Sequence, residues 1–195
     1  MVDQIILNNK TYIVNKNDLP CLVNYVEKVG GSHFTVTFIS NLFLQGEKIL
    51  FLTAFPMAKD NFFEQIKDNS EKAIYVTDEK QLDEAQGIIL ESGNKELFLK
   101  ALKMLPDINE RIILVKNIEA FSQDIFDDCL DFSNLILSGN IDKSVAKEQI
   151  IKKQFNTIIT FSKPQIKLPF NVPPLGKYIG YWWSENNKGL VKIEK

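Results

Sequence analysis

The sequence contains few of the residues on which metal sites and disulfide frameworks depend. Its 195 residues include two cysteines, one histidine and one arginine, Arg111. Cys21 and Cys129 have no metal-ligand spacing and are too few for a disulfide framework, so we expect both to be reduced and buried. His33 has no nucleophile or ligand pattern around it and is expected to be a hydrogen-bonded loop residue.

Long apolar segments are missing as well. No run approaches the roughly 18 residues of a membrane span, and Met1–Asp3 does not begin a signal peptide. We therefore expect a cytoplasmic protein with no membrane span. Hydrophobic residues at 45% and charged residues at 25% are typical of a globular protein, and the length suits one domain with a full core.

The net charge of −2 hides an uneven distribution. From Lys143 to the end, ten lysines oppose three acidic residues, whereas the rest of the chain has thirteen basic and twenty-two acidic residues. Such a division can mark a face for nucleic acid or for an acidic partner. Arginine is the usual bidentate reader of phosphate and guanine, and the chain has one. A solvated face or a protein contact is therefore favoured over nucleic acid.

Strand-like and helix-like segments alternate along the chain. Apolar runs of strand length predict strands at 21–27, 48–55, 72–77, 111–121 and 156–162. Amphipathic or capped segments predict helices at 34–46, 58–69, 81–107, 122–137 and 146–154, with Gly46 and Ser122 as caps of two of them.

These segments predict one α/β domain. Strands that alternate with helices form a mostly parallel central sheet flanked by helices. Asn8–Lys10 and Asn186–Gly189 are turn sequences between alternating segments, which predicts β-hairpins at both ends. The expected organisation is an N-terminal hairpin at 1–16, an α/β core at 21–163 and a C-terminal hairpin at 177–195.

The segment KVGGSHFT, residues 28–35, lies between a predicted strand and a predicted helix, where a phosphate-binding loop would lie. That loop reads G-x-x-x-x-G-K-[ST]: its backbone N–H groups face the phosphates, its lysine reaches them and its hydroxyl holds magnesium. Aligned with it, Lys28 and His33 replace the glycines, Phe34 replaces the lysine and Thr35 supplies the hydroxyl. The segment is thus a degenerate phosphate loop.

Small residues keep the interior of this loop open, namely Gly30, Gly31 and Ser32. Lys28 could partly compensate for the missing lysine. A K-G-G-x-x-K-T form of the loop, found in ATPases of the MinD/ParA type, uses an early lysine besides the later one. Here Val29 intervenes and Phe34 again occupies the later position.

The wider segment GGSHFTVTFISNLFLQGEKILFLTAF resembles the opening of the RecA-like ATPases of the KaiC and Rad-recombinase type. The turn QGEK and the strand ILFLTAFP follow the helix, as in that family. RIILVKNIEAF resembles the family's second motif, an apolar strand that ends in aspartate. NTIITFSKP and the final hairpin follow in family order, so the resemblance spans residues 22–192.

The departures from this family lie at the positions that its chemistry uses. Phe34 stands at the lysine, and Ala54 and Phe55 stand where the family has its general-base glutamate. Lys116, followed by Asn117, stands at the magnesium-associated aspartate. Phosphoryl transfer depends on placed positive charge, metal and an oriented water. The resemblance therefore implies a fold without ATPase machinery, for which neither ATP nor magnesium is an expected cofactor.

The sequence thus predicts a catalytically inactive RecA-like pseudo-ATPase that acts as a scaffold or regulatory subunit. The accessory subunits of Elongator, RecA-like folds that lack ATPase motifs and assemble into a ring, are a precedent by fold analogy. We expect a homo-oligomer or a pairing with an active paralogue, through the face around residues 30–35 and the basic C-terminal part.

Further interface candidates are the aromatic residues of the last hairpin, Tyr181, Trp182 and Trp183. The acidic run 127–131 is expected to be a solvated helix face rather than a metal site. Two alternatives stay open. One is an ATP sensor without hydrolysis that uses Lys28 and Thr35, and the other is a nucleic-acid-binding recombinase accessory that uses lysines between Lys143 and Lys167.

Overall fold

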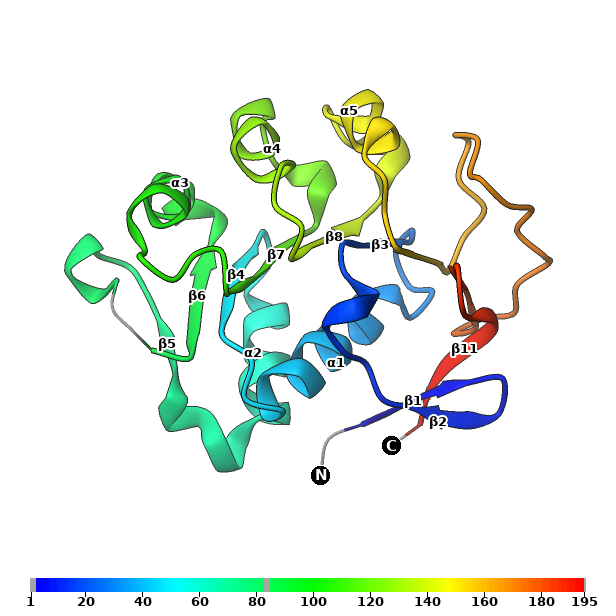
Figure 1. The fold of residues 1–195 in the computed structure, drawn as a ribbon, viewed down its shortest axis with the longest axis horizontal. Coiled ribbons are helices and arrows are strands. Elements are labelled where there is room, and N and C mark those ends of the chain that lie inside the picture. The colour runs from blue at the N-terminus through cyan, green and yellow to red at the C-terminus, as the bar shows by residue number, and fades with distance from the viewer. Residues whose placement is uncertain (1–2, 83–84, 195) are drawn as a thin grey trace.

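A computed structural model describes residues 3–82 and 85–194. Residues 1–2 and 195, at the outer ends of the two predicted hairpins, and residues 83–84, in the predicted helix 81–107, lie outside the described residues. The strands form one sheet of mixed direction in the order β2-β1-β11-β10-β9-β3-β8-β7-β4-β6-β5 (Figure 1). The chain is therefore an α/β protein, as predicted.

The parallel part of the sheet forms the centre and one edge of the molecule. Its strands are buried along nearly their whole length, which explains why their sequences are continuous apolar runs rather than alternating ones. They are β3 (Cys21–Asn24), β4 (Ile49–Thr53), β5 (Ala73–Tyr75), β6 (Gly87–Glu91), β7 (Ile112–Lys116), β8 (Leu135–Gly139) and β9 (Thr157–Thr160).

The antiparallel part joins the two ends of the chain. Asn8 and Asn9, with φ of 52° and 63°, make the turn of the N-terminal hairpin, since asparagine tolerates this left-handed region. The C-terminal hairpin pairs with this hairpin on one side and with β9 on the other. The four strands are β1 (Gln4–Leu7), β2 (Lys10–Tyr12), β10 (Gly180–Ser184) and β11 (Lys188–Glu194).

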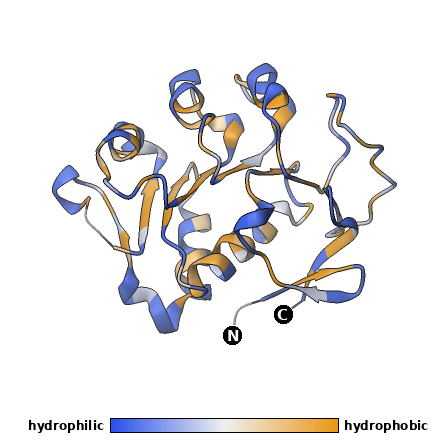
Figure 2. Cartoon of the chain, viewed as in Figure 1, coloured by the Kyte–Doolittle hydropathy of each residue, from blue (hydrophilic) through white to orange (hydrophobic). Residues whose placement is uncertain are grey.

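The helices cover both faces of the sheet. In Figure 1, α1 and α2 lie on one side of the central strands and α3, α4 and α5 lie on the other. Two apolar cores result, one under each helical layer, and Figure 2 shows apolar residues concentrated along the strands and the inner sides of the helices. The helices are α1 (Gly31–Leu44), α2 (Pro56–Gln65), α3 (Lys95–Met104), α4 (Gln123–Cys129) and α5 (Lys147–Lys152).

Short 3-10 helices connect several of these elements. They are η1 (Lys16–Asp18), η2 (Lys67–Lys72), η3 (Glu79–Gln81), η4 (Ser92–Asn94), η5 (Ile118–Ala120) and η6 (Ile141–Lys143). The longest helix, α1, ends where the sequence predicted, because Gly46 takes a φ of 96° just beyond it.

Two predicted helices were wrong in part, because each contains a strand. The predicted helix 81–107 includes β6, and the predicted helix 122–137 includes the start of β8. Both strands contain only a three-residue run of Ile and Leu, residues 88–90 in β6 and 135–137 in β8, a length at which periodicity does not separate a buried strand from a buried helix. Pairing across the sheet decides, since each strand lies between two parallel neighbours. Ser122 precedes α4, but its hydroxyl bonds Asp124 instead of a helix N–H.

Candidate functional site

The predicted phosphate loop lies at the carboxyl end of the parallel strands, in the middle of the sheet. β3 ends at Asn24 and α1 begins at Gly31, with Gly30 as its N-cap at a φ of 96°. β8 and β9 flank β3, so the loop lies beside the ends of both. Ligands of open α/β sheets bind at this end of the strands. The loop is therefore the candidate site that topology indicates.

The observed helix start changes how the loop is aligned with the phosphate-binding motif. The motif connects a strand directly to a helix. The eight residues that directly follow β3 are YVEKVGGS, residues 25–32. In this register Tyr25 replaces the first glycine, Gly30 is the second glycine, Gly31 replaces the lysine and Ser32 is the hydroxyl residue. This alignment begins three residues before the one the sequence indicates, and it matches two motif positions instead of one.

Phe34 and Thr35 point into the protein rather than toward the loop. The Phe34 ring is fully buried, with ring centroids 5.3 Å from Phe161 and 6.1 Å from Phe38. The Thr35 hydroxyl donates to the Gly31 carbonyl at 2.9 Å and lies 2.6 Å from Ser138 Oγ. Placing the motif's lysine and hydroxyl at positions 34 and 35 is therefore corrected, because both side chains belong to the core beneath α1.

The other residues of the predicted loop lie closer to the surface. Lys28 is exposed and has a φ of 64°. His33 Nε2 lies 2.7 Å from Asp3 Oδ2, so it bonds α1 to the N-terminal segment. Ser32 is exposed, in the first turn of α1. In the observed register, Ser32 occupies the [ST] position of the motif, Lys28 lies at one of its variable positions and His33 lies beyond it.

Tyr25 fills the space between the loop and the strand ends. It is 5% exposed, and a Cβ atom added to Gly31 would lie 2.4 Å from the Tyr25 ring. The Tyr25 hydroxyl accepts a hydrogen bond from Lys116 Nζ at 3.2 Å and one from Ser138 Oγ at 3.5 Å. Burial raises the pKa of Tyr25, while hydrogen bonds from Ser138 and Ser32 lower it in part. The phenol therefore stays neutral at physiological pH.

Lys116 is a buried cation at the end of β7. The residue is 1% exposed and is paired in register with Thr53 of β4 and Ser138 of β8. Its ammonium donates to the Tyr25 hydroxyl and, at 3.3 Å, to Asn117 Oδ1. Burial lowers the pKa of Lys116 to about 8, with a smaller opposing effect of the Glu119 carboxylate. No carboxylate of the described residues lies within ion-pair distance of it.

Residues that follow Lys116 form hydrogen bonds with the end of β8 and the residue after it. Asn117 has a φ of 69°, and its backbone N–H donates to the Ser138 carbonyl at 2.6 Å. The Glu119 carboxylate accepts from the Asn140 N–H at 2.9 Å. Ala54 and Phe55 follow β4 at the same edge, and the Phe55 side chain is 55% exposed.

The sequence did not indicate the roles of Tyr25, Ser138 or Glu119. A usable signal was present for Tyr25, which stands directly after the strand, where the motif has its first glycine. Ser138 is the last but one residue of β8, a strand that the sequence did not predict. Glu119 reaches β8 only because η5 folds back from the end of β7.

The aromatic residues of the last hairpin divide between the two faces of the sheet. Trp182 is fully buried, with ring centroids 4.6 Å from Tyr12 and 6.1 Å from Phe38. It is therefore a core residue, and its prediction as an interface anchor is corrected. Tyr181 and Trp183 face the other way and pack on Phe170, at 5.6 and 5.2 Å between centroids.

The acidic residues of α4 form contacts on the surface. Asp127 accepts from Gln123 at 2.9 Å, and Asp128 lies 2.7 Å from Lys103. Within residues 3–82 and 85–194, no three His, Cys, Asp or Glu side chains gather where they could hold a metal ion. Over the same residues, none of the helices combines the length and hydrophobicity needed to cross a bilayer.

Comparison with known proteins relates the chain to others by fold. No protein-family model matches the sequence, and no curated protein sequence matches it significantly. Among solved structures, the genome packaging NTPase B204 from Sulfolobus turreted icosahedral virus 2 in complex with AMPPCP has a TM-score of 0.57. It is 16% identical, with 93% of this chain and 99% of that chain covered. The complex of B204 with ATP-gammaS gives a TM-score of 0.57, 15% identity, and coverage of 93% and 98%.

The cytoplasmic domain of EssC is also similar, with a TM-score of 0.58 and 14% identity. The match covers 100% of this chain and 42% of the EssC chain, so this chain spans less than half of the EssC domain. Identities this low establish the fold alone. The chain has the fold of P-loop-type NTPases, with a mostly parallel sheet and antiparallel edge strands. The finer RecA-like assignment stays a prediction.

Proposed function

We propose that this protein is a catalytically inactive P-loop-type protein that acts as a scaffold or regulatory subunit. The observation that carries the proposal is the hydrogen bond between Lys116 Nζ and the Tyr25 hydroxyl beneath the loop. In P-loop NTPases, magnesium is held by the loop hydroxyl and by an aspartate of the second motif. Here these two positions are Ser32 and Lys116, and the Tyr25 hydroxyl lies between them.

The charge at this place is opposite to what magnesium requires. An ammonium in a low-dielectric site repels a divalent cation strongly, because the interaction is weakly screened. Lys116 keeps its proton at neutral pH even though burial lowers its pKa to about 8. The aspartate position therefore disfavours the metal that phosphoryl transfer needs.

The loop itself is adapted to the tyrosine. Gly31 occupies the position of the phosphate-binding lysine, and any side chain there would collide with the Tyr25 ring. The glycine makes room for the ring, so the two substitutions compensate for each other sterically. A loop closed in this way has neither the lysine nor the open interior that a β-phosphate needs.

A scaffold role is supported by the surface around the loop. Val26 and Tyr178 are 41% and 55% exposed, and Tyr178 lies against Gly30. Phe55 and Met57, at the same end of the sheet, are 55% and 72% exposed. These exposed apolar side chains are available for a contact with another protein surface. The basic C-terminal part and the acidic remainder of the chain supply complementary charge for a head-to-tail contact between subunits.

Restoring the motif tests the inactivity. The triple variant Tyr25→Gly/Gly31→Lys/Lys116→Asp reads G-V-E-K-V-G-K-S, and it places a carboxylate at the end of β7. We expect no Mg-ATP binding by the wild-type protein and micromolar binding by the triple variant. The double variant Tyr25→Gly/Gly31→Lys, which retains the ammonium, is the matched control. Micromolar Mg-ATP binding by the wild type would instead favour the ATP-sensing alternative.

Sedimentation measurements test the scaffold role. We expect self-association that weakens between low and high salt, since charge complementarity contributes to the contact. A variant with Phe55→Ser/Met57→Ser should associate less at every salt concentration. A strictly monomeric protein with which no partner co-purifies would contradict the proposal.

A further inference from the structure

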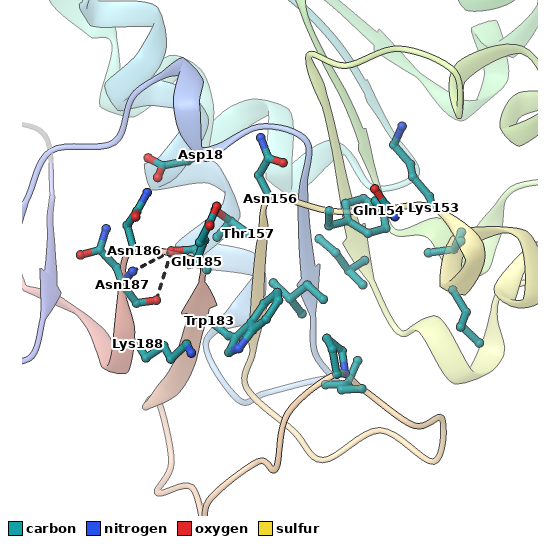
Figure 3. Close-up of a pocket in the computed structure, with 18 of the residues that line it drawn as sticks. Asp18, Lys153, Gln154, Asn156, Thr157, Trp183, Glu185, Asn186, Asn187 and Lys188 are labelled. Carbon is teal, nitrogen blue, oxygen red and sulfur yellow. Dashed lines mark hydrogen bonds between the residues drawn. The ribbon is translucent and has the colours of Figure 1, made fainter.

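A second candidate site lies away from the loop, in a groove of about 1140 Å³. It opens where β3 and β9 begin, between α5, the segment 163–170 and the turn of the last hairpin. Figure 3 shows Asp18, Asn186, Asn187 and Trp183 on one side of the groove and Lys153 and Gln154 on the other. We propose that this groove binds a segment of single-stranded nucleic acid.

The groove is large enough to hold a chain segment. Pockets for drug-sized ligands have volumes of about 300–1,000 Å³, and this groove exceeds that range. Its floor is apolar and comes from elements distant in sequence, with Leu22, Ile150, Ile158, Ile166 and Leu168 as members. Of these, Leu22, Ile150 and Ile158 are buried, and Ile166 and Leu168 are partly exposed, so they can contact the apolar parts of a ligand.

The charges that remain available on the rim are mostly positive. Lys152, Lys167 and Lys188 are exposed, and none forms an ion pair with the described residues. The Asp18 carboxylate is buried and already accepts from the Tyr12 hydroxyl at 2.7 Å. Glu185 is then the one exposed carboxylate among the lining residues. This balance suits a polyanion.

Trp183 supplies a stacking surface within the groove. Its ring is held parallel to Phe170 at 5.2 Å and 16°, and the Lys188 ammonium lies 6.0 Å from its centroid. An ordered, half-buried indole beside a cation is the arrangement on which bases of a single strand stack. A duplex keeps its bases stacked on one another and cannot use this surface.

Polar groups without partners line the same groove. The side-chain amides of Asn17, Gln154 and Asn186 form no hydrogen bond with the described residues. The Thr157 hydroxyl has no hydrogen-bond partner and is buried, since the whole residue is only 1% exposed. Amides pair with the edges of unstacked bases. Aromatic surface, free amides and free lysines thus occur together in one groove.

Fluorescence anisotropy with a labelled fifteen-nucleotide oligothymidine tests the proposal. With three phosphates neutralised, affinity should fall about 100-fold for a tenfold rise in salt, following the slope for single strands. The variant Lys152→Gln/Lys167→Gln/Lys188→Gln should bind at least about 10-fold more weakly and show a flatter salt dependence. The control variant Lys67→Gln/Lys72→Gln/Lys80→Gln, which removes three exposed lysines near β5, should bind like the wild type.

Stacking gives an independent measurement. Binding should quench tryptophan emission in the wild type, whereas Trp183→Leu should lose the quenching and bind about 5- to 100-fold more weakly. The lysine variant keeps the proposal testable if Trp183→Leu does not fold, because its substituted side chains are exposed. No binding at 25 mM salt, equal loss in both lysine variants, or equal affinity for a duplex of the same length would each overturn the proposal.

Discussion

Replacing Lys116 by methionine should increase stability at neutral pH. Burial lowers the pKa of Lys116 from 10.5 to about 8 in the folded protein. Each pKa unit corresponds to about 1.4 kcal/mol, so the buried ammonium costs the folded state about 3 kcal/mol while both states are protonated. Methionine has a similar length and no charge. Because two hydrogen bonds of about 1 kcal/mol each are also lost, the expected net gain at pH 7.5 is about 1–2 kcal/mol.

The gain should depend on pH with a defined sign. The folded pKa lies below the unfolded one, so above pH 8 the unfolded state binds more protons and the stability of the wild type rises. The cost is fully present below pH 8 and is lost as pH approaches 10.5. Between pH 7.5 and 9.5 the stability of the wild type relative to Lys116→Met should therefore improve by about 2 kcal/mol.

Urea unfolding at several pH values measures this difference. Lys80→Met, which removes the charge of an exposed lysine, serves as the control for the change in net charge. A constant difference between wild type and Lys116→Met from pH 7.5 to 9.5 would refute the reasoning, because it would mean that burial does not oppose the charge of Lys116.

Three further substitutions test the packing around the site and the last hairpin, each by urea unfolding. Gly139→Ala should destabilise by about 1–3 kcal/mol, because Gly139 has a φ of 147° and an added Cβ would lie 2.7 Å from the Ile118 nitrogen; unchanged stability would contradict this. Thr35→Val should cost about 1–3 kcal/mol, since Ser138 loses its 2.6 Å partner, whereas Thr35→Ser should retain most of the stability. Trp182→Ala should cost about 3–5 kcal/mol and more than Trp183→Ala, because Trp182 alone of the two is fully buried; equal losses would be inconsistent with the observed faces of β10.

Much of the architecture could be predicted from the sequence, because the strands at 21–27, 48–55, 111–121 and 156–162 are apolar runs bounded by turn residues. β6 and β8 could not, since each is a short apolar run inside a segment that also contains a helix. What distinguishes them as strands is pairing with neighbours distant in sequence, and no local pattern encodes that.

The candidate site could be predicted in part. The sequence pattern indicates Lys116 as the second-motif position, and the structure locates this residue at the end of β7, in contact with Tyr25; its assignment to the motif stays a prediction. The loop register could not be predicted, because it depends on where α1 begins. The Tyr25 ring packs on the backbone of Gly31 and leaves no room for a side chain there. A motif comparison that scores residue types does not detect this steric relation.

An equilibrium titration of the wild-type protein with fluorescent ATP, with and without magnesium, tests the central claim most directly. If the Tyr25 side chain and the Lys116 ammonium occupy the place of phosphate and metal, no saturable binding should occur up to millimolar nucleotide in either condition. Saturable micromolar binding that strengthens with magnesium would contradict the account, because it would mean that the loop still holds a nucleotide and its metal.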